Sequence, residues 1–101
     1  MRQYQKQYKE MKRSALRRGL RVTLTYSQFK FLTNITECHY CEAEIDWSNK
    51  RRYNLDRKVN RNGYHIDNVV VCCTKCNRLK GTEFKYSEYK RLAKKIRKVV
   101  K

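Results

Sequence analysis

The chain has 101 residues, about one domain's worth, and we expect a single domain over residues 1–101. Its 26 Lys and Arg outnumber 9 Asp and Glu and give a formal net charge of +17, which indicates a polyanionic partner. No run approaches the roughly 18 apolar residues of a transmembrane helix, and residues 1–12 are polar, which argues against a membrane protein or a signal peptide. We therefore expect an intracellular protein with no membrane partner; the sequence does not define its oligomeric state, and a monomer is assumed.

The N-terminal third predicts two helices with a short strand between them. Apolar residues recur every three or four positions and predict an amphipathic helix over 3–18 that ends at Gly19. Residues 20–24 alternate like a strand. The sequence T-Y-S-Q from Thr25 matches a capping box and predicts a second helix over 26–33.

The rest of the chain predicts two strands followed by two helices. A turn at Asn62-Gly63 separates the strands, and Ser87 is expected to cap the last helix. The expected elements are a strand over 53–57, a loop over 58–67, a strand over 68–73, a helix over 74–81 and a helix over 87–100. These elements divide the domain into a basic helical lead-in (1–35), a cysteine-containing core (36–82) and a basic C-terminal helix (83–101).

The cysteines predict a structural zinc site. Five cysteines, an odd number, argue against a secreted disulfide framework, and two C-x-x-C pairs in a reducing compartment are better interpreted as zinc ligands. A metal also suits a chain whose apolar fraction of 40% predicts a small core. We expect Cys72 to be a buried or strand-edge thiol outside the site and His39 to be an exposed residue of the zinc knuckle near the DNA. The predicted ligands are Cys38, Cys41, Cys73 and Cys76.

Residues 36–82 carry motifs that are specific as a set. Between the two cysteine pairs lie Asn54-Leu55-Asp56-Arg57, Asn62-Gly63-Tyr64 and Asn68-Val69-Val70, and the second pair continues into Asn77-x-x-Lys80-Gly81. With these residues the chain resembles the HNH endonuclease family, in particular its small phage-type members with an Asp-Arg pair in the first strand. The resemblance implies an α+β fold, a small zinc-stapled ββα-metal (HNH) core with flanking N- and C-terminal helices. A phage-encoded protein of this kind would act in the cytoplasm of a host cell.

The same resemblance implies an activity, the divalent-metal-dependent hydrolysis of DNA phosphodiester bonds. Asp56 and Asn77 would bind the catalytic ion, and Asn68 would hydrogen-bond backbone across the loop. A carboxylate and an amide oxygen form a hard, sparse ligand set that suits Mg2+ or Mn2+. Because Asn77 follows Cys76, the zinc site would also fix the position of this ligand.

The chain departs from the family at the position of the general base. Most HNH nucleases have a histidine after the first-strand aspartate, and here that position is Arg57, which cannot accept a proton. Arg57 could instead stabilise charge on the phosphate. Three explanations stay open for the base: His65 in the loop, a metal ion that acidifies water without help from a protein base, or loss of catalysis.

The positive charge predicts that DNA phosphates dominate binding. We expect the basic faces of the two terminal helices to take part, including Lys6, Lys9, Arg97 and Lys98. The main predicted DNA contacts are Arg13, Arg17, Arg57, Lys80, Lys94 and Lys95. Two other functions stay open: a non-catalytic zinc-stabilised module that binds nucleic acid, and a basic accessory of a phage or ribosomal assembly.

Overall fold

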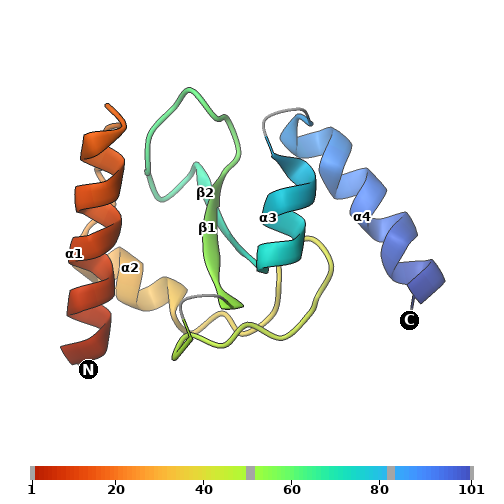
Figure 1. Cartoon of the computed structure of the whole chain (residues 1–101), viewed down its shortest axis with the longest axis horizontal. Coiled ribbons are helices and arrows are strands. Elements are labelled where there is room, and N and C mark those ends of the chain that lie inside the picture. Colours follow the sequence, from red (N-terminus) through yellow and green to blue (C-terminus); the bar gives the residue numbers. More distant parts are fainter. Residues whose placement is uncertain (1, 50–51, 82–83, 101) are drawn as a thin grey trace.

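A central antiparallel hairpin lies between two groups of helices (Figure 1). The computed structural model describes residues 2–49, 52–81 and 84–100. In chain order its elements are α1 (Arg2–Arg17), α2 (Tyr26–Leu32), β1 (Asn54–Arg57), β2 (Val69–Cys72), α3 (Thr74–Lys80) and α4 (Tyr86–Val100). Figure 1 shows α1 and α2 on one side of the hairpin and α3 and α4 on the other. The predicted α+β class and the predicted order of these elements are confirmed.

Local sequence signals explain where the helices begin and end. The predicted capping box is present: Gln28 N donates to Thr25 Oγ1 at 3.1 Å, and Thr25 N donates to Gln28 Oε1 at 2.9 Å. Helix α3 ends at Gly81, whose φ of 48° lies in the left-handed region. The prediction that Ser87 caps α4 is wrong. This helix already begins at Tyr86, and an exposed glutamate in its first turn accepts the preceding backbone N–H.

The hairpin places alternate residues of β1 on opposite faces. Its register pairs Asn54 with Cys72, Leu55 with Val71, Asp56 with Val70 and Arg57 with Val69. The two polar residues Asn54 and Asp56 lie on the face toward α3, where they contact Thr74 and Lys80. Strand β2 is buried along its whole length, which fits its continuous β-branched run.

Aromatic contacts pack each group of helices against the centre. Phe29 of α2 packs edge-on against Trp47, at 6.0 Å between ring centroids, and Trp47 stacks on Tyr53 at 4.6 Å. On the other side, Tyr40 packs edge-on against Tyr89 of α4 at 4.9 Å. The segment between α2 and β1 is therefore part of the core and connects both groups of helices.

The expected strand over 20–24 is wrong. Only Val22 forms a bridge, to Tyr64 in the loop between β1 and β2. The Tyr64 N–H donates to Arg21 O at 2.8 Å, and the backbone N–H groups that follow Val22 donate to Tyr64 O. The alternating pattern reflects a half-buried segment, but the loop offers no extended partner with which it could form a ladder.

Gly63 lets this segment approach the loop. A Cβ atom at position 63 would lie 2.1 Å from Arg21 O, so any side chain would push the two backbones apart. We expect Gly63→Ala to lower the free energy of unfolding by roughly 1–3 kcal/mol, as overpacked sites do. Thermal unfolding by circular dichroism measures the loss. Asn62→Ala, in the same turn but exposed, is the matched control, and equal melting temperatures for the two variants would contradict the prediction.

No helix in the described part of the chain is long and apolar enough to cross a membrane.

Candidate active site

The four cysteines of the two C-x-x-C pairs converge on one point. The sulfur atoms of Cys38, Cys41, Cys73 and Cys76 all lie within 4.8 Å of one another. The Cys41 and Cys73 sulfurs are 3.7 Å apart. Zinc–sulfur bonds of about 2.3 Å in a tetrahedron give a sulfur–sulfur distance of about 3.8 Å, so the cluster fits a structural zinc ion.

The backbone around the first pair forms a tight knuckle. Cys38 N donates to Ala43 O at 2.8 Å, and Glu42 returns the chain with a positive φ of 66°. The Tyr40 N–H points at the Cys38 sulfur, 3.4 Å away, just as the Cys76 N–H points at Cys73. Such N–H donors stabilise thiolates, and the donor at Cys76 makes Cys73 the N-cap of α3 as well.

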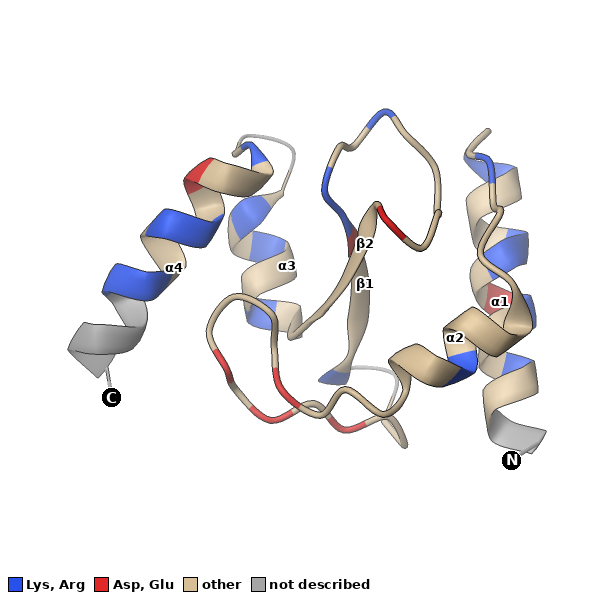
Figure 2. Cartoon of the chain, turned by 180° about the vertical axis from the view of Figure 1, so that it is seen from behind, with Lys and Arg blue, Asp and Glu red and all other residues tan. Residues whose placement is uncertain are grey.

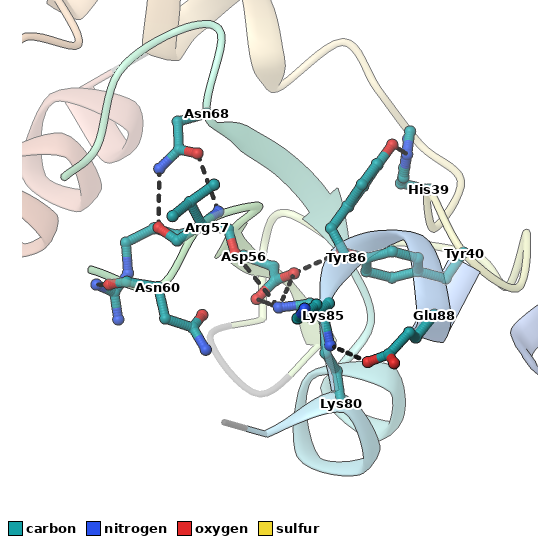
Figure 3. Close-up of polar contacts among 11 residues, drawn as sticks. His39, Tyr40, Asp56, Arg57, Asn60, Asn68, Lys80, Lys85, Tyr86 and Glu88 are labelled. Atoms are coloured by element: carbon teal, nitrogen blue, oxygen red, sulfur yellow. Dashed lines mark hydrogen bonds and ion pairs between the residues drawn. The ribbon is translucent and has the colours of Figure 1, made fainter. Parts of the chain in front are cut away.

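Cys72 and His39, which the sequence did not predict to be zinc ligands, lie outside this cluster. Cys72 is completely buried in β2, and burial raises its pKa, which keeps it a neutral thiol. His39 is exposed, and its Nε2 lies 2.7 Å from the Tyr86 hydroxyl. The His39 ring also stacks on Tyr86, with 5.7 Å between the ring centroids, so it points toward α4 (Figure 3).

Asp56 is held by three contacts in the interior (Figure 3). The Tyr40 hydroxyl donates to Asp56 Oδ2 at 2.5 Å, and the Lys80 ammonium lies 3.3 Å from the same oxygen and 3.4 Å from Oδ1. Burial, followed by the carboxylate of Asp56, raises the pKa of Tyr40, so this hydroxyl stays protonated and remains a donor. The zinc knuckle therefore positions the carboxylate through Tyr40.

Asp56, Arg57 and Asn77 line one cleft of about 740 Å³ together with arginines of α1. We call this space the cleft. Its α1 wall carries the exposed Arg13 and Arg17, and the exposed Arg18 follows in the turn just after the helix. The other wall is formed by β1, the loop after it and α3. The Asn77 amide contacts Asn54 Oδ1 at 3.4 Å, which ties α3 to β1. A carboxylate and an amide oxygen thus border the same basic space.

The loop after β1 fixes Arg57. The Arg57 guanidinium donates to Asn60 O and, at 3.4 Å, to Asn62 O. It lies 5.6 Å from the centre of the Tyr64 ring. Asn68 closes the same loop. Its Oδ1 accepts from Val59 N at 3.0 Å, and its Nδ2 donates to Val59 O and Gly63 O at 3.3 and 2.9 Å. The loop therefore presents Arg57 at a defined place in the cleft.

Several residues predicted to act in catalysis or to contact DNA do not line the cleft. Lys80 was expected to contact DNA, but its side chain is only 1% exposed because it is buried against Asp56. His65 accepts from or donates to Thr23 Oγ1 at 2.5 Å and does not line the cleft. The exposed Lys94 and Lys95 lie on α4, on the far side of the hairpin from α1. Lys6 and Lys9 are exposed on α1 but do not line the cleft, and the side chains of Arg97 and Lys98 lie outside the described part of the chain.

The sequence interpretation missed two residues of the site. Arg18, in the turn just after α1, lines the cleft and donates to the Tyr64 hydroxyl at 3.0 Å, which joins the end of α1 to the loop. Its position next to Arg17 at the end of a basic helix could have suggested this role. Tyr40 carried no such signal, because its contact with Asp56 depends on the folded knuckle.

Charge is distributed unevenly over the fold (Figure 2). Four of the nine acidic residues lie in the segment between α2 and β1, at Glu37, Glu42, Glu44 and Asp46. Lys and Arg are spread over α1, α3, α4 and the loop between the strands. The cleft is bordered by basic elements, so a polyanion would be attracted toward the cleft and away from the acidic segment between α2 and β1.

Comparison with known proteins identifies the class of fold. The structure is similar to that of the rare-cutting HNH restriction endonuclease PacI, with a TM-score of 0.77, and the match covers 91% of this chain and 75% of that chain. At 23% sequence identity this likeness shows the fold, the HNH ββα-metal fold that the sequence predicted, with four cysteines that fit its zinc site.

One curated relative resembles the sequence. An uncharacterized protein of Acanthamoeba polyphaga mimivirus is 37% identical over 76 residues, which is 74% of this chain. The match spans only 13% of that viral protein's length. No family model matches the chain.

Proposed function

We propose that this protein is an HNH-type endonuclease that hydrolyses DNA phosphodiester bonds with the help of a divalent ion. The observation that carries this proposal is the cleft, in which Asp56 and Asn77 border the same space as Arg57 and the arginines of α1. A hard carboxylate, an amide oxygen and several guanidinium groups are the donors that a phosphodiester and a Mg2+ or Mn2+ ion need. The HNH fold supports the same interpretation.

Each side chain has a defined part in this proposal. Asp56 and Asn77 would hold the divalent ion, which supplies charge stabilisation at the phosphate and makes water more acidic. Arg57 would bind a non-bridging phosphate oxygen and offset the charge that develops there. The arginines of α1 would hold the neighbouring phosphates, while Asn68 keeps the loop and hence Arg57 in place.

Incubation with supercoiled plasmid tests the proposal directly. The zinc-loaded protein should convert the plasmid to nicked or linear DNA with Mg2+ or Mn2+, and EDTA should stop the reaction. If duplex, branched and single-stranded DNA all stay intact with Mg2+, Mn2+, Ni2+ and Co2+, the nuclease proposal fails.

The second candidate function is a non-catalytic module that binds nucleic acid. One observation favours it: Lys80 already neutralises Asp56, so the carboxylate has a cationic partner without any divalent ion. Under this alternative the protein would bind DNA through the cleft with no cleavage, and added Mn2+ would leave its affinity unchanged. Gel-shift and plasmid assays on the same sample separate the two functions.

Arg57 should matter more for cleavage than His65. Because Arg57 lines the cleft and His65 does not, Arg57→Ala should lower the cleavage rate by roughly a hundredfold or more, and His65→Ala by less than about threefold. Arg57→Lys should restore little, since an ammonium lacks the paired donors of a guanidinium. Single-turnover cleavage measures the effects. Arg61→Ala, exposed in the same loop, is the matched control, and a larger loss from His65→Ala would return His65 to the role of base.

DNA affinity should depend steeply on salt, and the α1 wall should contribute to the slope. Each phosphate that the protein neutralises adds roughly 0.9 to the slope of log affinity against log salt. The double variant Arg13→Ala/Arg17→Ala should therefore reduce the slope by roughly 1.8. Fluorescence anisotropy at several salt concentrations measures it. Lys30→Ala, exposed on α2 and outside the cleft, is the control, and an equal effect from Lys30→Ala would contradict this use of the cleft.

A further inference from the structure

The ion pair between Lys80 and Asp56 occupies the carboxylate on which the proposed ion site depends. Lys80 is 1% exposed and Asp56 is 7% exposed, so both charges are removed from solvent. The ammonium contacts both oxygens of the carboxylate and lies 3.3 Å from Arg57 O. Lys80 lies in the last turn of α3, and these contacts hold its side chain in place. The side chain cannot move into solvent without breaking a buried ion pair.

This ion pair leaves the part of the cleft around Asp56 and Asn77, where the divalent ion would bind, without net negative charge. The single charge of Asp56 is balanced by Lys80, and Arg57 and the arginines of α1 add positive charge nearby. Glu10, the other acidic residue that lines the cleft, belongs to α1, on the opposite wall from Asp56. A divalent cation that enters the cleft without DNA would therefore be repelled by several fixed cations. The Asp56 carboxylate would attract it only weakly, because Lys80 already neutralises that charge.

We propose that Lys80 makes divalent-ion binding at Asp56 conditional on bound DNA. The phosphate of a bound strand restores negative charge beside the carboxylate and adds its own oxygen ligands to the donor groups of Asp56 and Asn77. The order of binding is then DNA first and ion second. This inference rests on the proposed nuclease function, since it concerns the same ion site.

Titration with Mn2+, followed by electron paramagnetic resonance, tests the order. The zinc-loaded wild-type protein is titrated alone and with a short phosphorothioate duplex, which slows cleavage, and binding to duplex alone is subtracted. We expect Mn2+ to bind at least tenfold more tightly when the duplex is present. Asp56→Asn with the duplex defines the background, because it retains the shape of the side chain and loses its charge.

The variant Lys80→Met tests the residue itself. Removing the ammonium frees the carboxylate, so the affinity for Mn2+ without DNA should rise at least tenfold, and added Mn2+ should raise the melting temperature of this variant by several degrees. Lys75→Met, the same change at an exposed position of α3, should leave both quantities as in the wild type. Zinc content and circular dichroism check the fold, and Lys80→Gln replaces Lys80→Met if the methionine variant does not fold.

The results separate this inference from the function on which it rests. Equal Mn2+ affinity of the wild type with and without duplex, or an unchanged DNA-free affinity in a folded Lys80 variant, overturns the role of Lys80 but leaves an ion site at Asp56. If no Mn2+ binding depends on Asp56 even with duplex present, the ion site fails, and both this inference and the proposed nuclease function fail with it.

Discussion

Asp56→Asn is expected to lower metal-dependent DNA cleavage by roughly a hundredfold to a thousandfold, with zinc content and DNA affinity close to those of the wild type. The carboxylate is the negative ligand of the proposed ion site, whereas Asn77 adds only a neutral amide oxygen. Asn77→Ala should therefore reduce cleavage by a smaller factor, and higher Mn2+ concentration should recover part of the loss. Plasmid nicking over a range of Mn2+ concentrations measures both effects.

The buried ion pair decides which substitution gives a clean result. Asp56→Ala would leave Lys80 charged and unpaired in the interior, a change that costs about 3–5 kcal/mol of stability and confuses loss of folding with loss of catalysis. Asparagine also removes the negative charge that pairs with Lys80, but it retains an oxygen that can accept from the Tyr40 hydroxyl and from the Lys80 ammonium. A melting curve shows how much stability remains. Asp67→Asn, an exposed change of the same charge, is the control. Full cleavage by Asp56→Asn would exclude Asp56 as a ligand.

The largest structural effect is expected from loss of zinc. Binding of a structural zinc ion contributes about 10–16 kcal/mol in small zinc domains, which is comparable to or larger than the total stability of about 5–15 kcal/mol typical of a domain. Cys73→Ser should therefore lower the zinc content and unfold the region around β2 and α3. Serine is itself a good N-cap, so this variant retains the cap of α3 and removes only the metal ligand. Zinc analysis and circular dichroism measure the result.

Cys72, the residue before Cys73, provides the control. Cys72→Ala removes a buried thiol that lies outside the four-cysteine cluster. It should keep about one zinc ion per chain and lose only the roughly 1–3 kcal/mol expected of a small cavity. If Cys73→Ser retained both full zinc and full stability, the cluster would not be the structural metal site that its geometry indicates.

The sequence predicted several local features correctly, although the local cap expected at Ser87 was wrong. The capping box at Thr25, the end of α3 at Gly81 and the two C-x-x-C pairs each depend on residues a few positions apart, and each appears in the structure as expected. The family motif added the fold and placed Asp56 and Asn77 in one region. These parts follow from backbone geometry and ligand spacing, which short stretches of sequence record directly.

Contacts between distant segments could not be predicted in this way. Lys80 looks like any other basic helical residue, and only the packing of α3 against β1 reveals that it is buried against Asp56. Residues 20–24 alternate like a strand, yet the loop around Tyr64 lets them form only one bridge. Arg18 belongs to the cleft because α1 meets that loop. Each of these outcomes depends on where a second segment lies, which periodicity does not describe.

The cysteine cluster also has a consequence for the order in which the molecule folds. Cys41 and Cys73 are 32 residues apart, whereas the contact of Arg18 with Tyr64, which joins the two walls of the cleft, spans 46 residues. Loop closure is entropically unfavourable, and a cross-link that already shortens the chain between two segments lowers the entropy lost when they meet. Zinc capture draws Tyr64 and the hairpin toward the knuckle, and Trp47, in the segment that follows the knuckle, packs against Phe29 of α2. The hairpin and its metal would therefore form first, and the arginine wall of α1 would dock last, on a surface already in its final shape.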